Sequence, residues 1–159
     1  MISAFLKKLL FARQFAMTDG NIVMLGQKQI MLPNDVIFEI ERINPQIVYQ
    51  TIKRVMRRDI ELYAKKLGSG EEGMLKSVDN IFETSGLGRL EIFNIDYKKK
   101  KSIVRVHHPP VFDMGESSKI GSKIIPAVLS GTFSFLFRKD VDVSQVPYRG
   151  NDYYEYEIK

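Results

Sequence analysis

The chain has 159 residues, of which 44% are hydrophobic and 27% are charged. This size and composition are ordinary for one soluble globular domain with its own core. The sequence contains no cysteine, which excludes disulfides, thiolate metal sites and cysteine nucleophiles. No apolar run approaches the roughly 20 residues of a membrane span, and no signal-peptide cleavage pattern is present. We therefore expect a cytoplasmic protein without stable membrane insertion.

The net charge of +5 comes from 24 basic and 19 acidic residues, and two clusters hold much of the excess. One is the run of four lysines at 98–101, and the other is Lys53, Arg54, Arg57 and Arg58 on one side of a helix. Neither cluster is interleaved with aromatic residues or matches a known nucleic-acid-reading motif. We interpret both as solvated surfaces and expect no nucleic-acid partner.

Residues 1–15 carry apolar side chains at helical spacing and predict a helix. A stripe of this kind packs on its own domain or on a partner subunit more often than it attaches to a membrane surface. We expect one domain over residues 1–159, with the 1–15 helix as a possible dimer contact and 16–159 as the body. The stripe consists of Ile2, Phe5, Leu6, Leu9, Leu10 and Phe15.

The next segment, residues 21–32, alternates around Gly26-Gln27 and predicts a hairpin. Helices are then predicted over 34–43, 47–67 and 71–83, where Asn44-Pro45 and Gly68 supply the breaks.

The second half of the chain predicts strands over residues 89–97 and 102–107, then a long helix and two more strands. The helix begins at a cap on Ser117 or Ser118 and runs to Arg138, and the strands cover residues 140–146 and 154–158. Because strands gather in meander pairs and do not alternate singly with helices, we predict an α+β domain. It would have a mainly antiparallel sheet packed against several helices.

Small residues interrupt the bulky ones along the predicted long helix, so another backbone or a ligand could approach closely there. These are Ala127, Ser130, Gly131 and Ser134.

The run LSGTFSFLFRKDVDVSQVPYRGNDYYEYEI at residues 129–158 resembles the end of the vinyl-reductase-type (4-vinyl reductase) small-molecule-binding domain. The matching features are the small-residue helix, the Gly150-Asn151-Asp152 turn and the ending Glu155-Tyr156-Glu157-Ile158. This family also provides the hydrocarbon sensors of phenol-responsive regulators. It shares a fold with the small subunits of the TRAPP vesicle-tethering complex. The same fold forms the ligand-binding domain of nitric-oxide signalling and Golgi transport proteins. The resemblance implies that fold, a ligand pocket and frequent pairing into homodimers.

Metal-binding members of that family use cysteines flanking the Gly-Asp turn, a third near the start of the long helix, and a nearby glutamate. The flanking positions fall on Val146 and Tyr154 here, the glutamate position falls near Val143, and residues 120–122 hold no cysteine. Valine cannot ligate zinc, and neutral tyrosine is a poor ligand. The resemblance therefore carries over the fold and a pocket without the metal, and we expect neither a structural metal nor a cofactor.

No convincing catalytic constellation emerges from the remaining motifs. Residues 68–73 match G-x-G-x-x-G by letter, but they follow a helix and include two glutamates where a phosphate would approach. Glu155 and Glu157 share a strand face that we interpret as solvated, and Ser130-Gly131 lacks the preceding residues of a nucleophile elbow. His107 and His108 point to opposite faces of a strand, so they chelate one ion only if Pro109 breaks that strand.

The favoured hypothesis is a non-enzymatic protein that binds a small apolar or aromatic ligand between the long helices and the sheet. A protein-interaction scaffold of the TRAPP-subunit type is the first alternative, and an accessory protein of tetrapyrrole or hydrocarbon metabolism is the second. From helix face and the placement in the family, the candidate lining residues are Phe112, Ile124, Val128, Phe133 and Phe137, with His107 or Tyr148 as polar contacts.

Overall fold

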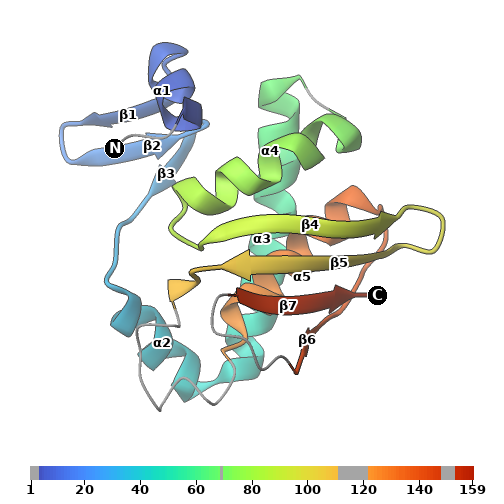
Figure 1. Cartoon of the computed structure of the whole chain (residues 1–159). Helices are drawn as coiled ribbons and strands as arrows, with labels where there is room; N and C mark the ends of the chain where they lie inside the picture. Colours follow the sequence, from blue (N-terminus) through green and yellow to red (C-terminus); the bar gives the residue numbers. More distant parts are fainter. Residues whose placement is uncertain (1–3, 69, 111–121, 148–152) are drawn as a thin grey trace.

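The computed structural model describes residues 4–68, 70–110, 122–147 and 153–159 (Figure 1). Its elements are, in chain order, α1 (Ala4–Phe11), β1 (Phe15–Thr18), β2 (Asn21–Met24), β3 (Gln27–Gln29), α2 (Asn34–Ile43), α3 (Pro45–Leu67), α4 (Glu71–Thr84), β4 (Arg89–Asp96), β5 (Lys101–His107), α5 (Ile124–Leu136), β6 (Val143–Val146) and β7 (Tyr153–Ile158).

Two antiparallel sheets and the helices packed on them make this an α+β structure, which confirms the predicted fold class. The smaller sheet has the order β1-β2-β3, and the larger has the order β4-β5-β7-β6. In the larger sheet the β4–β5 hairpin is a meander, whereas β7 returns from far along the chain to pair with β5. The helices α3 and α5 lie behind this sheet in Figure 1.

The side chains of β5 alternate between the two faces of the larger sheet. Val104 and Val106 are fully buried and face the helices, while Arg105 and His107 are only partly buried and face the other way. The register pairs Val104 with Tyr156, so the aromatic and aliphatic residues of β7 join the same inner face. This inner face forms one wall of the main core.

The helix α5 is the centre of the structure. It contacts α3 on one side and strands β6 and β7 on the other, and 12 of its 13 residues are buried. A helix that is apolar all round has to lie inside a protein, which explains why its sequence shows so few polar residues.

The start of α5 corrects the predicted long helix. The helix begins at Ile124, with Lys123 in the cap position, and does not continue back to Ser122. Pro126 lies in its first turn, where the missing N–H costs no helical hydrogen bond. The predicted capping residues Ser117 and Ser118 lie outside the described residues.

The N-terminal sheet corrects two further predictions. Residues 15–18 form strand β1 and do not continue the first helix, because Asp19 and Gly20 turn the chain back with positive φ angles of 51° and 73°. Two positive φ values in a two-residue loop are what a type I′ hairpin requires. The second hairpin turns at Leu25-Gly26 and not at the predicted Gly26-Gln27.

The apolar stripe of α1 packs at least partly on its own domain. Leu9 is 3% exposed and belongs to the main core together with Met24 and Leu25, and Phe5 packs against that core. By contrast, the Phe11 side chain is 94% exposed. The predicted stripe residue Ile2 lies outside the described residues.

Candidate functional site

Three of the predicted lining residues come together beneath the sheet. Val128, Phe133 and Phe137 are all buried in the main core. The rings of Phe133 and Phe137 lie 5.6 Å apart between centroids, and Tyr97 meets Phe137 edge-on at 5.8 Å. These contacts are ordinary aromatic core packing, and they hold the C-terminal half of α5 against the sheet.

The fourth described residue of that set, Ile124, lies in a separate apolar cluster. Ile124 and Phe38 are each 8% exposed, and Ile37, Ile52 and Tyr154 pack around them while only partly buried. The cluster lies where α2, α3, the start of α5 and β7 meet, and we call it the junction cluster. Phe112 and Tyr148 lie outside the described residues.

The small residues of α5 make room for another helix. A Cβ atom added at Gly131 would lie 2.9 Å from the Met56 Cβ and 3.0 Å from the Arg57 backbone nitrogen, and it would also strike the Lys53 carbonyl oxygen. The hydroxyl of Ser130 donates a hydrogen bond of 2.5 Å to the Val141 carbonyl. Of the two possibilities raised by the sequence, the close approach at Gly131 is therefore that of the α3 backbone.

His107 lies on the opposite face of the sheet from α5. Its Nε2 atom is 3.0 Å from a carboxylate oxygen of Glu91, and its ring centroid is 5.4 Å from that of Tyr153. The hydrogen bond to His107 lowers the pKa of Glu91. On the same face Arg105 stacks on Phe93 and Tyr153 and pairs with Glu155. His107 thus belongs to a polar outer layer and does not face the side that Val128 and Phe133 occupy.

Glu41 of α2 ties the start of α5 to the junction cluster, and the sequence analysis missed it. Its carboxylate accepts hydrogen bonds from the Lys123 backbone N–H and from the Ser122 hydroxyl, the latter at 2.8 Å. The Ser122 hydroxyl oxygen in turn accepts from the Ile124 N–H at 3.1 Å. Glu41 is itself buried, so a carboxylate from another helix does the work of an N-cap. The sequence signal that could have revealed this role is the position of Glu41, an acidic residue one helical turn after Phe38 on the inward side of α2.

We expect Glu41→Ala to lower the free energy of unfolding by about 1–3 kcal/mol, because it removes two hydrogen bonds to a buried carboxylate at the start of α5. Glu41→Gln keeps one carbonyl acceptor and should cost less. Urea denaturation of both variants measures the difference. Equal losses in the two would show that the carboxamide cannot replace the carboxylate, and no loss in Glu41→Ala would contradict the capping role.

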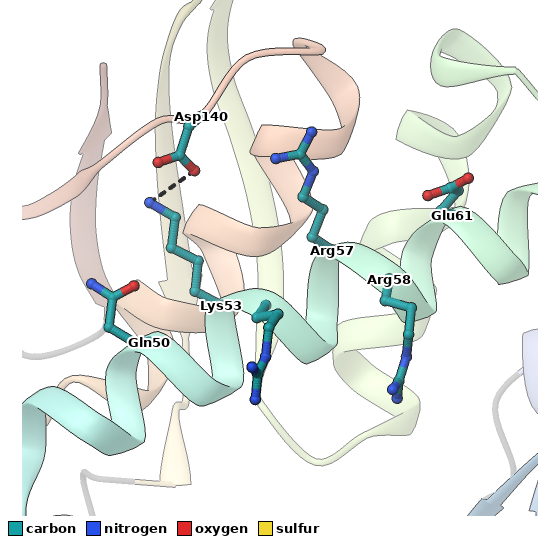
Figure 2. A pocket seen from close by; sticks show the side chains of 7 residues that line it. Gln50, Lys53, Arg57, Arg58, Glu61 and Asp140 are labelled. Carbon is teal, nitrogen blue, oxygen red and sulfur yellow. Dashed lines mark ion pairs between the residues drawn. The ribbon is translucent and has the colours of Figure 1, made fainter.

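A groove of about 320 Å³ runs along the outer face of α3 (Figure 2). Its walls carry four cationic and two carboxylate side chains, and all but one of the lining residues belong to α3. They are Gln50, Lys53, Arg54, Arg57, Arg58, Glu61 and Asp140.

Lys53 links this groove to the chain after α5. Its side chain is 10% exposed, and its Nζ atom lies 3.1 Å from Asp140 and 3.3 Å from Asp142. Burial lowers the pKa of the Lys53 ammonium, but the two carboxylates outweigh burial and raise the pKa overall. The pairing holds α3 to the loop between α5 and β6. Lys53 is therefore a partner in a structural ion pair and not simply part of the solvated helix face predicted from the sequence.

In the part of the chain that the structure describes, no three histidine, aspartate or glutamate side chains gather as a metal site would require. His108 follows the end of β5 with a φ angle of 49° and is exposed. Within the same residues no helix combines the length and apolar character needed to cross a bilayer.

Comparison with known proteins was informative at the level of structure. No family model and no curated protein sequence matches the chain. The crystal structure of the phenol-responsive sensory domain of the transcription activator PoxR, solved with phenol, superposes with a TM-score of 0.68 at 17% identity. That match covers 99% of this chain and 91% of the PoxR domain. This match shows a shared fold.

Two further solved structures share the vinyl-reductase-type fold. A vinyl-4-reductase family protein from Methanocaldococcus jannaschii has a TM-score of 0.52 at 15% identity, covering 82% of this chain and 83% of that one. A trafficking protein particle complex subunit 3 from Naegleria fowleri, covalently bound to palmitic acid, has a TM-score of 0.52 at 14% identity. The match covers 79% of this chain and 88% of that one. The resemblance seen at residues 129–158 thus extends, as a fold, over almost the whole chain.

Proposed function

We propose that this protein binds a small apolar or aromatic molecule and is not an enzyme. The observation that carries the proposal is the match over 99% of the chain to a sensory domain solved with phenol. A second protein of the same fold was solved with palmitic acid. The two ligands share a largely apolar body, and the palmitic acid is covalently bound.

The junction cluster is our proposed place for the ligand. It is a small apolar cluster beside the main core, and Ile37, Ile52 and Tyr154 around it are only partly buried, with Ile52 and Tyr154 also packing against that core. An apolar ligand would complete the burial of these side chains, which is favourable in proportion to the apolar area removed from water. We propose Ile124 as a lining residue, with Phe112 and Tyr148 as candidates from the segments outside the described residues.

We expect phenol, a short alkylphenol or palmitate to raise the melting temperature of the protein, because a ligand specific for the folded state stabilises it by mass action. Ile52→Ala should weaken this shift, whereas Ile103→Ala, a partly buried isoleucine on the outer face of β5, should preserve it. Differential scanning fluorimetry measures both, and native mass spectrometry of freshly purified protein identifies any retained molecule. If no apolar compound shifts the melting temperature and no molecule is released on denaturation, the proposal fails.

The alternative of a protein-interaction scaffold is favoured by one observation, an exposed apolar stripe on α2 and the first turn of α3. Val36, Ile40 and Ile43 follow each other on α2 at spacings of four and three residues, Ile47 lies just beyond the break at Asn44, and all four are exposed. This spacing is the one that helices use to pack against another helix, and exposed apolar surface of this kind marks an interaction site. We propose that it forms the contact of a homodimer.

The dimer should be visible by light scattering at micromolar concentration as twice the mass of one chain. Ile40→Asp combined with Ile43→Asp should yield monomer without loss of fold, because both side chains point to solvent in the single chain. Phe11→Asp tests the earlier expectation of a contact through the first helix and should leave the dimer intact. A wild-type protein that is monomeric would rule the dimer out.

A further inference from the structure

The basic groove on α3 holds positive charge that ion pairs within the described residues only partly engage. Lys53 pairs with Asp140 and Asp142, and Arg58 pairs with its neighbour Asp59 at 3.0 Å. Within the described residues, Arg54 and Arg57 form neither an ion pair nor a side-chain hydrogen bond. Both are exposed and line the groove.

This arrangement is unfavourable for the helix taken alone. Lys53 and Arg57 are four residues apart, as are Arg54 and Arg58, and like charges at this spacing on a helix repel each other. The α3 backbone around Lys53 and Arg57 is also fixed, since it packs directly on Gly131 of α5. The cations are therefore close together along a rigid stretch of α3. We propose that this groove binds an acidic segment of a partner protein.

The shape of the groove favours an extended occupant over a single ion. From Gln50 to Glu61 the lining residues span about 16 Å along α3, at about 1.5 Å per residue. Figure 2 shows Arg57 pointing to the side of Asp140, whereas Arg58 points to the opposite side of the helix. One small anion therefore cannot contact the whole set. An extended peptide rises about 3.3 Å per residue, so about five residues would follow the groove. Its carboxylates would reach the cations that share its side of the helix.

The lining residues are also poorly suited to bind nucleic acid. None of the side chains that line the groove is aromatic, so it offers no stacking platform for bases. Glu61 and Asp140 place carboxylates within it, and these would face an unbroken phosphate backbone. A peptide can position uncharged residues at those two points, so the charge pattern fits an acidic polypeptide better.

The test is fluorescence anisotropy with a fluorescein-labelled peptide of about eight alternating glutamate and serine residues, long enough to span the groove. Wild-type protein should bind it, and binding should weaken steeply with added salt. Arg54→Glu combined with Arg57→Glu should reduce the affinity by about tenfold or more, because like charges then face each other. The control is Lys98→Glu with Lys99→Glu in the β4–β5 turn, which makes the same change in net charge and should alter affinity less than about twofold.

Three outcomes would overturn the proposal. Equal losses in the two double variants would mean that only net charge attracts the peptide. Absence of binding by the wild type would mean that the groove has no such ligand. Groove-dependent binding of a single-stranded DNA oligonucleotide that exceeds peptide binding would assign the groove to nucleic acid. Melting temperatures of both variants confirm that they are folded, and the phenol shift at the junction cluster should be unchanged in both.

Discussion

Gly131→Ala should destabilise the protein by about 1–3 kcal/mol, the usual cost of overpacking a core. The sign of this stability change is informative, because alanine in the interior of a helix is normally favoured over glycine by about 0.5–1 kcal/mol. Here the new methyl group would overlap the Lys53 carbonyl oxygen and lie 3.0 Å from the Arg57 nitrogen. Both are backbone atoms of α3, and they can move only if the whole helix shifts.

Gly70→Ala is the matched control for this variant. Gly70 precedes α4 with a φ angle of −74°, and a Cβ added there would meet no atom within 4 Å. Because Gly70 is the N-cap of α4 and alanine is a poorer N-cap than glycine, we expect a loss of at most about 1 kcal/mol, with no steric contribution. Urea denaturation of the two variants gives the comparison. A Gly131→Ala variant as stable as the wild type would mean that α3 and α5 stand further apart, with space between them for a ligand.

Local sequence patterns predicted most of the elements in this fold because the physics of those elements is local. The α3 helix begins where Asn44 accepts a hydrogen bond from the Ile47 N–H at 3.0 Å, and it ends at Gly68 with a φ of 63°. The N-cap and the C-terminal glycine are both recognisable from residues next to the helix ends. The alternation in β7 likewise places Tyr156 and Ile158 in the core and Glu157 outside.

The errors arose where a distant residue decides the outcome or where a turn signal was overlooked. Asp19-Gly20 is a strong hairpin signal. Because residues 1–15 were predicted as one helix, the strand that precedes Asp19-Gly20 was not predicted. The start of α5 depends on Glu41, which lies more than 80 residues earlier in the chain. No pattern around Ser118 or Ile124 could have revealed that partner.

The candidate site shows the same division between local and distant information. Helical spacing correctly grouped Val128 and Phe133 of α5 with its C-cap residue Phe137. It could not show that Ile124 joins a different cluster, because that depends on where α2 packs. The face occupied by His107 follows from strand register, since Val104 and Val106 point inward and His107 alternates with them. The sequence of one strand does not say which of its faces a helix will cover.

Phe133→Ala should have the largest effect of the substitutions considered, about 3–5 kcal/mol of lost stability. The Phe133 side chain is 0% exposed and packs on Phe137, at the centre of the main core. Removing its ring leaves a cavity that the rigid contact between α5 and α3 cannot close. Phe133→Leu removes less volume, leaves a smaller cavity and should therefore cost less than Phe133→Ala.

Phe93→Ala serves as the control for loss of an aromatic ring. Phe93 is 59% exposed on β4, and its main contact is the Arg105 guanidinium 4.2 Å from its ring centre. Its removal should cost about 0.5–1 kcal/mol, the typical value of an exposed cation–π contact.

Denaturation in urea, with and without phenol, then separates two roles for Phe133. A residue of the packed core gives the full loss, and phenol stabilises the variant and the wild type equally. A residue on the wall of a ligand cavity gives a loss below about 2 kcal/mol, since part of its surface already lacks protein contacts. Its removal would then also change the phenol-dependent gain. That second pattern would move the proposed ligand from the junction cluster to the space beneath the sheet.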